Sequence, residues 1–336
     1  MTLRISELNL GGLPILMSYG KIGLVGKRKR NIQRKALCAS ESKLMPKIKI
    51  TNDYQLPQEL VNLVEADAYD RGESQVSATD LLKPSRMFAL QQVHKDELQV
   101  DVSEALRAEY GTAWHEKIER YVSSDSIVEK RMYAVFGDWV LSGKPDLLQF
   151  NNKTLVDWKT ALVASYLNKE REEFQDWEQQ LNIYKFLWEE NHPEHPVEHM
   201  KVVVFLVDYS PSKREQSLDY PHVSVLEVTP TMWTHDETRH WISNQIDKHQ
   251  RALKELPLCT DEERWHRGDK WAAVKPGASR ATRLFANEFE AQDFAQKKGL
   301  DIQHRPGVSL RCRYWCPVSQ FCDQHKLQEE NQNAKF

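Results

Sequence analysis

The sequence predicts an α/β fold in which helices flank a mixed sheet and a C-terminal lobe is held together by cysteines. Short segments that alternate between apolar and polar residues fill positions 128–158, and a helical apolar stripe follows them. Three of the five cysteines then stand within one short stretch near the C-terminus. The 336 residues suffice for a substantial core, so we expect a single elaborated domain.

The first part of the chain is strongly basic. Residues 1–50 hold eleven Lys and Arg against two Glu, whereas the whole chain has a net charge of −3. The apolar stretch 8–26 is too short and interrupted to span a membrane, and its basic residues follow it, which is the wrong order for a signal peptide. A DNA-binding arm, a transit peptide and a natural start at Met45 are three interpretations. We expect a flexible segment without an essential role.

Four strands are predicted in the middle of the chain, joined by turns that fix their register. Gly137-Asp138 and Asn151-Asn152 are candidates for two-residue hairpin turns. The strands are expected at residues 128–136, 139–142, 147–150 and 154–158.

The two turns bring three carboxylates to one side of the sheet. They place Asp146 opposite both Glu129 and Asp157, with the Cβ atoms of each opposed pair roughly 4.5–5.5 Å apart. Lys159 lies two residues beyond Asp157 and therefore shares that side. Pro145 would break the ladder in the middle strand unless a bulge is present, and a bulge would spoil the pairing of Glu129.

These four side chains suit phosphodiester hydrolysis. Crowded carboxylates repel one another unless a cation neutralises them, and hard oxygen ligands favour Mg²⁺ or Mn²⁺. Such a metal polarises a phosphoryl oxygen and lowers the pKa of a bound water. Lys159 would orient that water or offset negative charge in the transition state. A solvated acidic face is the other interpretation, but the shared register of Glu129, Asp146 and Asp157 favours the catalytic one.

A family resemblance adds further residues. Pro145-Asp146 followed by Asp157-Trp158-Lys159 resembles the PD-(D/E)XK nuclease superfamily. Its RecB-like branch has a helix before the sheet that carries a histidine, similar to Gly111-Thr-Ala-Trp-His115, and a later Gln-x-x-x-Tyr, similar to Gln180-Leu-Asn-Ile-Tyr184. The resemblance covers about residues 74–190. It implies a restriction-endonuclease-like fold, catalysis by Lys159, a DNA path along Gln180 and Tyr184, and metal ligands at His115, Glu129, Asp146 and Asp157.

The segment around Gln180 also has the pattern of a core helix. One apolar stripe at helical spacing is formed by Phe174, Trp177, Leu181, Tyr184 and Trp188. Gln180 borders this stripe beside Tyr184. For these two residues a structural role and a role in DNA contact both stay open.

The C-terminal cysteines form a metal-ligand pattern rather than a disulfide framework, because the chain is large and we expect it to be intracellular. AddB-type and CRISPR-adaptation nucleases of the RecB-like branch bind an iron–sulfur cluster through one cysteine before the core and three after it. This chain resembles that plan but has spacings of x3 and x5 instead of x2 and x5, and Lys83-Pro84-Ser85 where the first cysteine would stand. We predict a [4Fe–4S] cluster, with Zn²⁺ as the alternative, on Cys259, Cys312, Cys316 and Cys322. Substitutes for Cys259 are Cys38, His266, His304 and His325.

The remaining segments complete the predicted architecture. Residues 201–207 and 222–228 are expected to extend the sheet, and 231–253 to form a long helix after Pro230. Trp265 and Trp271 would stack on unpaired bases or, more commonly, pack the lobe. The predicted parts are the basic segment 1–50, the nuclease core 51–255 and the cysteine lobe 256–336.

We therefore expect a cytoplasmic Mg²⁺- or Mn²⁺-dependent DNA exonuclease, without membrane association, that acts on linear ends in recombination, repair or phage DNA metabolism. The chain has no P-loop, so a helicase or recombination partner would provide any motor. A structure-specific endonuclease is one alternative. Unlike the exonuclease, it would not depend on DNA ends, so linear and circular DNA distinguish the two. A non-catalytic nucleic-acid-binding module is another, and the intact Asp146, Asp157 and Lys159 argue against it. The oligomeric state is left open.

Overall fold

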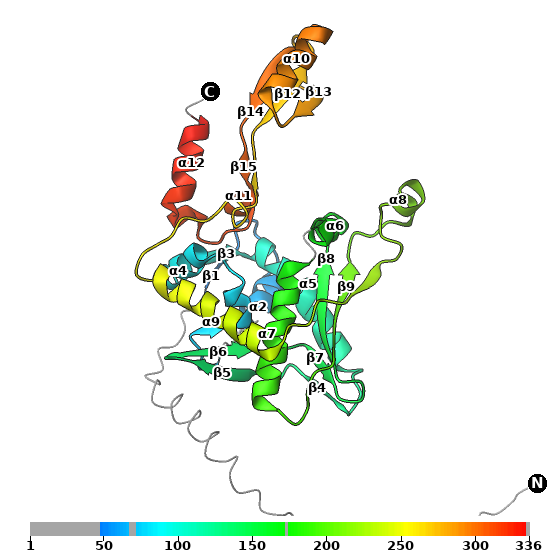
Figure 1. Ribbon diagram of the computed structural model, residues 1–336, viewed down its shortest axis with the longest axis vertical. Helices are drawn as coiled ribbons and strands as arrows, with labels where there is room; N and C mark the ends of the chain where they lie inside the picture. The colour runs from blue at the N-terminus through cyan, green and yellow to red at the C-terminus, as the bar shows by residue number, and fades with distance from the viewer. Residues whose placement is uncertain (1–47, 67–71, 172–173, 334–336) are drawn as a thin grey trace, which may run out of the picture. The chain divides into compact units, whose positions relative to one another are not determined.

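A computed structural model describes residues 48–66, 72–171 and 174–333 of the chain. Residues 1–47 of the predicted basic segment, Cys38 among them, lie outside the described residues. Helices and mixed sheets alternate along the described part, which confirms the predicted α/β class (Figure 1). The domain boundaries at 50/51 and 255/256 stay predictions.

The largest sheet has the strand order β10-β9-β8-β7-β4. Strands β8 (Thr154–Ala161) and β9 (His199–Leu206) run parallel, because the helices α6 (Val163–Arg171) and α7 (Gln175–Asn191) return the chain to the same end of the sheet (Figure 1). The other neighbours pair antiparallel, and β10 extends the sheet beyond β9 as predicted. The other strands are β7 (Leu147–Gln149), inside the sheet, and β4 (Ser126–Val128) and β10 (Val225–Val228) at its two edges.

A second sheet has the order β2-β6-β5, formed by β2 (Val76–Ser77), β6 (Trp139–Gly143) and β5 (Met132–Phe136). Phe136 pairs with Trp139, and Gly137 has a φ of 58°, so the predicted two-residue turn is confirmed. The second turn is longer than predicted, because Gln149 pairs with Thr154 and Lys153 takes the positive φ of 50°.

The prediction of one continuous strand over 128–136 was wrong. The chain leaves the ladder after Val128, at Glu129, and the partner segment leaves it around Pro145, which has no amide to donate. The two interruptions are equally long, since Val128 still pairs with Leu147 and Met132 with Gly143. The break therefore divides one hairpin between two sheets without shifting its register.

Helix α7 provides much of the main core. It packs on β5, β6, β8 and on α9 (His235–Ala252), and Trp177, Leu181 and Trp188 are buried as its apolar stripe predicted. Helix α9 begins at His235, where the Thr234 hydroxyl and the Glu237 carboxylate form a capping box, rather than directly after Pro230.

The remaining elements of the core are short, apart from the 18-residue helix α5. A parallel pair of strands joins β1 (Lys49–Thr51) to β3 (Gln99–Asp101). The helices are α2 (Gln58–Ala66), α3 (Ala78–Leu81), α4 (Ser85–Val93), α5 (Val102–Glu119) and α8 (Pro211–Gln216). None of the described helices is long and apolar enough to cross a membrane.

The C-terminal part contains a small sheet with its own apolar cluster. Strands β13 (Ala281–Phe285), β12 (Lys270–Val274) and β14 (Asp301–Arg305) form it in that order, and α10 (Glu288–Lys298) packs on it (Figure 1). It is inserted between β11 (His266–Arg267) and β15 (Val308–Ser309), which pair antiparallel. The chain then continues through α11 (Leu310–Tyr314), a 3₁₀ turn (Ser319–Phe321) and α12 (Asp323–Asn333).

Candidate active site

The three predicted carboxylates lie where the two sheets separate. Asp146 immediately precedes β7, and the pairing of Leu147 with Val156, carried one residue further, places it opposite Asp157. On the other side, the amide of Glu129 donates to the carbonyl oxygen of Asp146 at 3.2 Å. The row Glu129–Asp146–Asp157 therefore has the register that the turns predicted.

Lys159 and His115 border this row. The Lys159 Nζ atom lies 2.7 Å from Asp157 Oδ2, and Asp157 is 1% exposed. The amide of Trp158 donates to Asp146 Oδ2 at 2.7 Å, which fixes the Asp146 carboxylate against β8. On helix α5, His115 places Nδ1 3.5 Å from Asp146 Oδ1 and Nε2 3.2 Å from the Trp158 carbonyl oxygen. The structure thus brings four of the predicted residues together around Asp146.

Glu129 is held differently. Its Oε2 lies 2.6 Å from Lys144 Nζ, in an ion pair whose side chains are 39% (Lys144) and 35% (Glu129) exposed. Its φ of 46° is left-handed, a conformation that costs on the order of 1–3 kcal/mol in a residue other than glycine. Sequence reasoning gave Lys144 no role. Its position two residues before Asp146 was the available signal, because such residues share one side of an extended strand.

The electrostatics of the site favour a bound cation. Burial, and then the charge of Asp157, raise the pKa of Asp146 well above its usual range. Burial alone would lower the pKa of Lys159, but the charges of Asp157 and Asp146 outweigh it and raise that pKa. One ammonium therefore faces two largely buried carboxylates. Asp157 Oδ2 is paired with the Lys159 ammonium, and such buried carboxylate oxygens are donors that fit a hard divalent metal.

The acidic side chains do not have the geometry of a metal site in this structure. Among the described residues, no group of three or more His, Cys, Asp or Glu side chains is placed to hold a metal ion. Two of the carboxylates are instead paired with lysines: Asp157 with Lys159, and Glu129 with Lys144. The metal-binding roles stay predictions.

Gln180 and Tyr184 contact each other in the core. Gln180 Nε2 donates to the Tyr184 hydroxyl at 2.9 Å, and the residues are only 7% and 6% exposed. Tyr184 also lies against β6, since a Cβ added to Gly143 would be 3.0 Å from its ring. This placement explains the structural part of their pattern, whereas their role in DNA contact stays a prediction.

The predicted cysteine ligands form a second group of ionisable side chains. Burial, then the charges of Glu263, Cys322 and Cys312, raise the pKa of the Cys259 thiol to about 12. Burial also raises the pKa of Cys312 and Cys316, and the charges of neighbouring cysteines add to both shifts. Cys312 and Cys322 therefore lie within electrostatic range of each other and of both Cys259 and Cys316. Among the described residues, these thiols, like the carboxylates, form no group that is placed to hold a metal ion.

Arg86 links the cysteine group to helix α4. Its side chain is 3% exposed and donates from Nε to Cys322 Sγ at 3.2 Å and from Nη1 to the Pro257 carbonyl oxygen at 2.8 Å. It also forms an ion pair with Asp323. Sequence reasoning missed Arg86, because no spacing rule relates a helix to a loop 236 residues later.

The candidate histidine substitutes differ in their surroundings. His304 Nε2 lies 2.7 Å from Asp269 Oδ2, and His266 Nδ1 lies 3.1 Å from Ser309 Oγ. His325 Nδ1 is buried and has no hydrogen-bond partner among the described residues. His325 Nε2 lies 3.6 Å from Glu329 Oε1, and His325 stands three residues after Cys322 in the chain.

The two tryptophans of this region contact neighbouring side chains. The Arg311 guanidinium lies 4.2 Å from the ring centre of Trp265, which is 44% exposed. Trp271 packs in the cluster under α10, with its ring 5.3 Å from His304. Packing thus accounts for Trp271.

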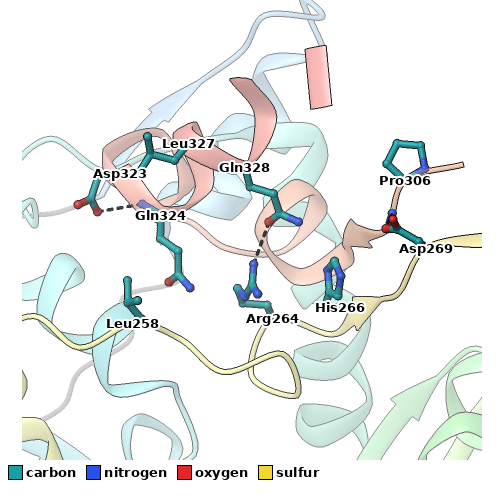
Figure 2. Close-up of a pocket in the computed structure, with 10 residues that line it drawn as sticks. Leu258, Arg264, His266, Asp269, Pro306, Asp323, Gln324, Leu327 and Gln328 are labelled. Atoms are coloured by element: carbon teal, nitrogen blue, oxygen red, sulfur yellow. Dashed lines mark hydrogen bonds between the residues drawn. The ribbon is translucent and has the colours of Figure 1, made fainter. Parts of the chain in front are cut away.

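A pocket of about 460 Å³ lies beside α12 (Figure 2). Arg264 and His266 line one side and Gln324 and Gln328 the other, and Arg264 Nη1 donates to Gln328 Oε1 at 3.0 Å. None of the predicted carboxylate ligands lines it. The candidate active site is therefore marked by its side-chain chemistry and not by the depth of this cavity.

Comparisons with known proteins give a family and two distant structures. The chain matches the sequence model of the PD-(D/E)XK nuclease superfamily over residues 50–323. No curated protein matches it. The crystal structure of SSO0001 is 16% identical with a TM-score of 0.42 and covers 61% of this chain and 88% of its own. A phage-related exonuclease from Haemophilus somnus 129PT is 13% identical with a TM-score of 0.33, covering 51% and 80% respectively.

Proposed function

This chain belongs to the PD-(D/E)XK nuclease superfamily, and from that premise we propose that it is a metal-dependent deoxyribonuclease centred on Asp146, Asp157 and Lys159. Nucleases of this superfamily are hydrolases that generally use divalent metals such as Mg²⁺. The observation that carries the proposal is the buried Asp157 with Lys159 Nζ at 2.7 Å, opposite Asp146 in the ladder. Glu129 and His115 complete the proposed metal-binding set.

The chain's own residues would prepare the phosphodiester for attack. A bound Mg²⁺ or Mn²⁺ supplies Lewis acidity and lowers the pKa of water. The Trp158 amide donates a hydrogen bond to the Asp146 carboxylate. Because this donor belongs to the backbone of β8, it fixes the orientation of the carboxylate. The raised pKa of Lys159 keeps its ammonium protonated, and it can then offset the negative charge that develops on the phosphoryl oxygens.

We further propose exonuclease action on linear DNA, which the resemblance of the His115 and Gln180–Tyr184 motifs to the RecB-like branch supports. A helicase or recombination partner belongs to the same proposal. A cleavage assay would use end-labelled linear DNA and closed circular DNA with Mg²⁺, with Mn²⁺ and with EDTA.

The matched variants are Asp157→Asn and Asp138→Asn, since Asp138 is an exposed turn residue of the preceding hairpin. Metal-dependent loss of linear DNA alone, absent in Asp157→Asn and kept in Asp138→Asn, is the expected result. Cleavage of circular DNA would favour an endonuclease. DNA binding without cleavage under any metal would favour the non-catalytic module.

For the second group we propose that Cys259, Cys312, Cys316 and Cys322 hold a [4Fe–4S] cluster, with Zn²⁺ as the alternative. The electrostatic interactions of Cys312 and Cys322 with each other and with both Cys259 and Cys316 support the ligand set. After anaerobic purification we expect broad absorbance at about 400 nm, as for other cysteine-bound clusters. Cys259→Ser should lose it and Cys38→Ser should keep it. A colourless protein with about one zinc per chain would reject the cluster, and a metal-free protein would reject the site.

A further inference from the structure

A third group of charged residues belongs to neither site. It lies in the small sheet β13-β12-β14, which no role described so far uses. The sheet segments 267–285 and 301–305 hold six Lys and Arg against two Asp, although the chain as a whole is slightly acidic. The acidic residues of this region stand mainly on α10, at Glu288, Glu290 and Asp293.

Two of the basic residues are directly opposed in the ladder. Lys270 of β12 pairs with Arg305 of β14, so both side chains point to the same side of the sheet. Trp271, the next residue, faces the cluster under α10. Because successive side chains alternate, Lys270 and Arg305 face away from that helix. Like charges placed directly opposite each other are destabilising unless an anion lies between them.

The β12–β13 loop adds further positive charge to this side. Arg305 Nη2 donates to the Ser279 carbonyl oxygen at 2.9 Å, which brings the loop back toward the opposed pair. Arg280 follows directly in the chain and is exposed. Lys270, Arg280 and Arg305 together are called the basic face.

The charges of the basic face are not neutralised from within the described part of the chain. No carboxylate there lies within ion-pair distance of its three members; Arg305 bonds only to the uncharged Ser279 and Gln303 oxygens. The nearby Asp269 carboxylate is engaged by the Gly307 amide at 2.8 Å and by His304. Asp301 is paired with Val274, at the opposite end of β12 from Lys270.

We propose that the basic face binds the phosphodiester backbone of DNA. The inference rests on the proposed deoxyribonuclease function, and it adds a substrate-binding surface outside the candidate active site. Exposed Lys and Arg side chains on a sheet suit an extended polyanion, because phosphates repeat along its length and their recognition requires no enclosed pocket. Contacts of this kind are independent of base sequence and are weakened by salt.

The test compares two double variants of the same small sheet and helix. Lys270→Gln/Arg280→Gln removes two charges from the basic face, and neither side chain has a hydrogen bond or ion pair within the described residues. Lys297→Gln/Lys298→Gln removes two charges from the end of α10. Binding of a short fluorescent duplex is measured by anisotropy in EDTA, over a range of salt concentrations, so that cleavage does not contribute.

Loss of two phosphate contacts should reduce the slope of log K against log salt by about 1.8 and weaken binding at about 0.1 M salt by on the order of tenfold or more. The α10 variant should bind as the wild type does. An unchanged slope in the basic-face variant, an equal loss in both variants, or a wild type that does not bind DNA overturns the inference. If the basic-face variant shows the expected change in slope but the wild type never cleaves DNA, only the proposed catalysis is overturned.

Discussion

The carboxylate row and the cysteine group are both clusters of buried and half-buried ionisable side chains, but they are positioned in different ways. Asp146 and Asp157 are placed by a β-ladder. Once one pair of opposed residues in such a ladder is known, the next pair along the strands is known as well. The cysteines stand in loops and a short helix, and Arg86 connects them to the core from helix α4. A regular ladder determines a site from local spacing, whereas a loop site depends on contacts between distant segments.

The largest expected effect tests the carboxylate row. Lys159→Ala should slow cleavage by about 10²–10³-fold, because it removes a preorganised positive charge from the place where negative charge develops. Lys201→Ala is the control, since Lys201 is also a strand lysine, on β9, with a carboxylate partner, Glu227, at 2.9 Å. Single-turnover rates at saturating metal measure the effect, and circular dichroism checks the fold. Wild-type cleavage by Lys159→Ala would remove it from the mechanism.

The next effect tests the cysteine group through its link to the core. Arg86→Ala should lower the free energy of unfolding by about 3 kcal/mol, because a buried guanidinium and its bonds to Cys322 Sγ and the Pro257 carbonyl are lost. Asp323→Asn should change it by less than about 1 kcal/mol, because the Asp323 side chain is 77% exposed. Urea denaturation measures both. A similar small change in the two variants would show that Arg86 does not anchor this segment.

A third effect tests how tightly α7 packs against β6, the strand that ends just before the carboxylate row. Gly143→Ala should cost about 1–3 kcal/mol, because the added Cβ would lie 2.5 Å from Leu187 and 3.0 Å from Tyr184. Gly268→Ala is the control, since nothing lies within 4 Å of a Cβ there. Thermal denaturation of the two variants gives the comparison. Equal stability would mean that α7 can move away from β6 at little cost.

The same contrast explains what the sequence could predict. Period-two alternation and the two turns, Gly137-Asp138 and Asn151-Asn152, determined the opposition of Glu129, Asp146 and Asp157, because these are local properties of the strands. Pro145 indicated a break correctly. Its consequence was not predictable, because the matching departure of Glu129 from the ladder depends on a left-handed φ that no residue type there favours.

Other features needed the folded chain. The position of Arg86 beside Cys322 follows from the packing of α4 against the C-terminal segment, which is a contact between distant parts of the sequence. The opposition of Lys270 and Arg305 also arises only after α10 has returned β14 to the edge of β12. Sequence spacing therefore predicted ladder neighbours well and long-range partners poorly.

The smallest expected effect concerns Lys144, whose ion pair with Glu129 would compete with the proposed metal. An exposed ion pair of this kind is worth up to about 1 kcal/mol, which corresponds to roughly two- to fivefold in an equilibrium. Lys144→Ala should therefore lower the Mg²⁺ concentration needed for half-maximal cleavage by about that factor, with little change in stability. The control is Lys153→Ala, which breaks another exposed pair, with Glu198. A raised Mg²⁺ requirement in Lys144→Ala alone would instead assign Lys144 to holding Glu129 in its ligand position.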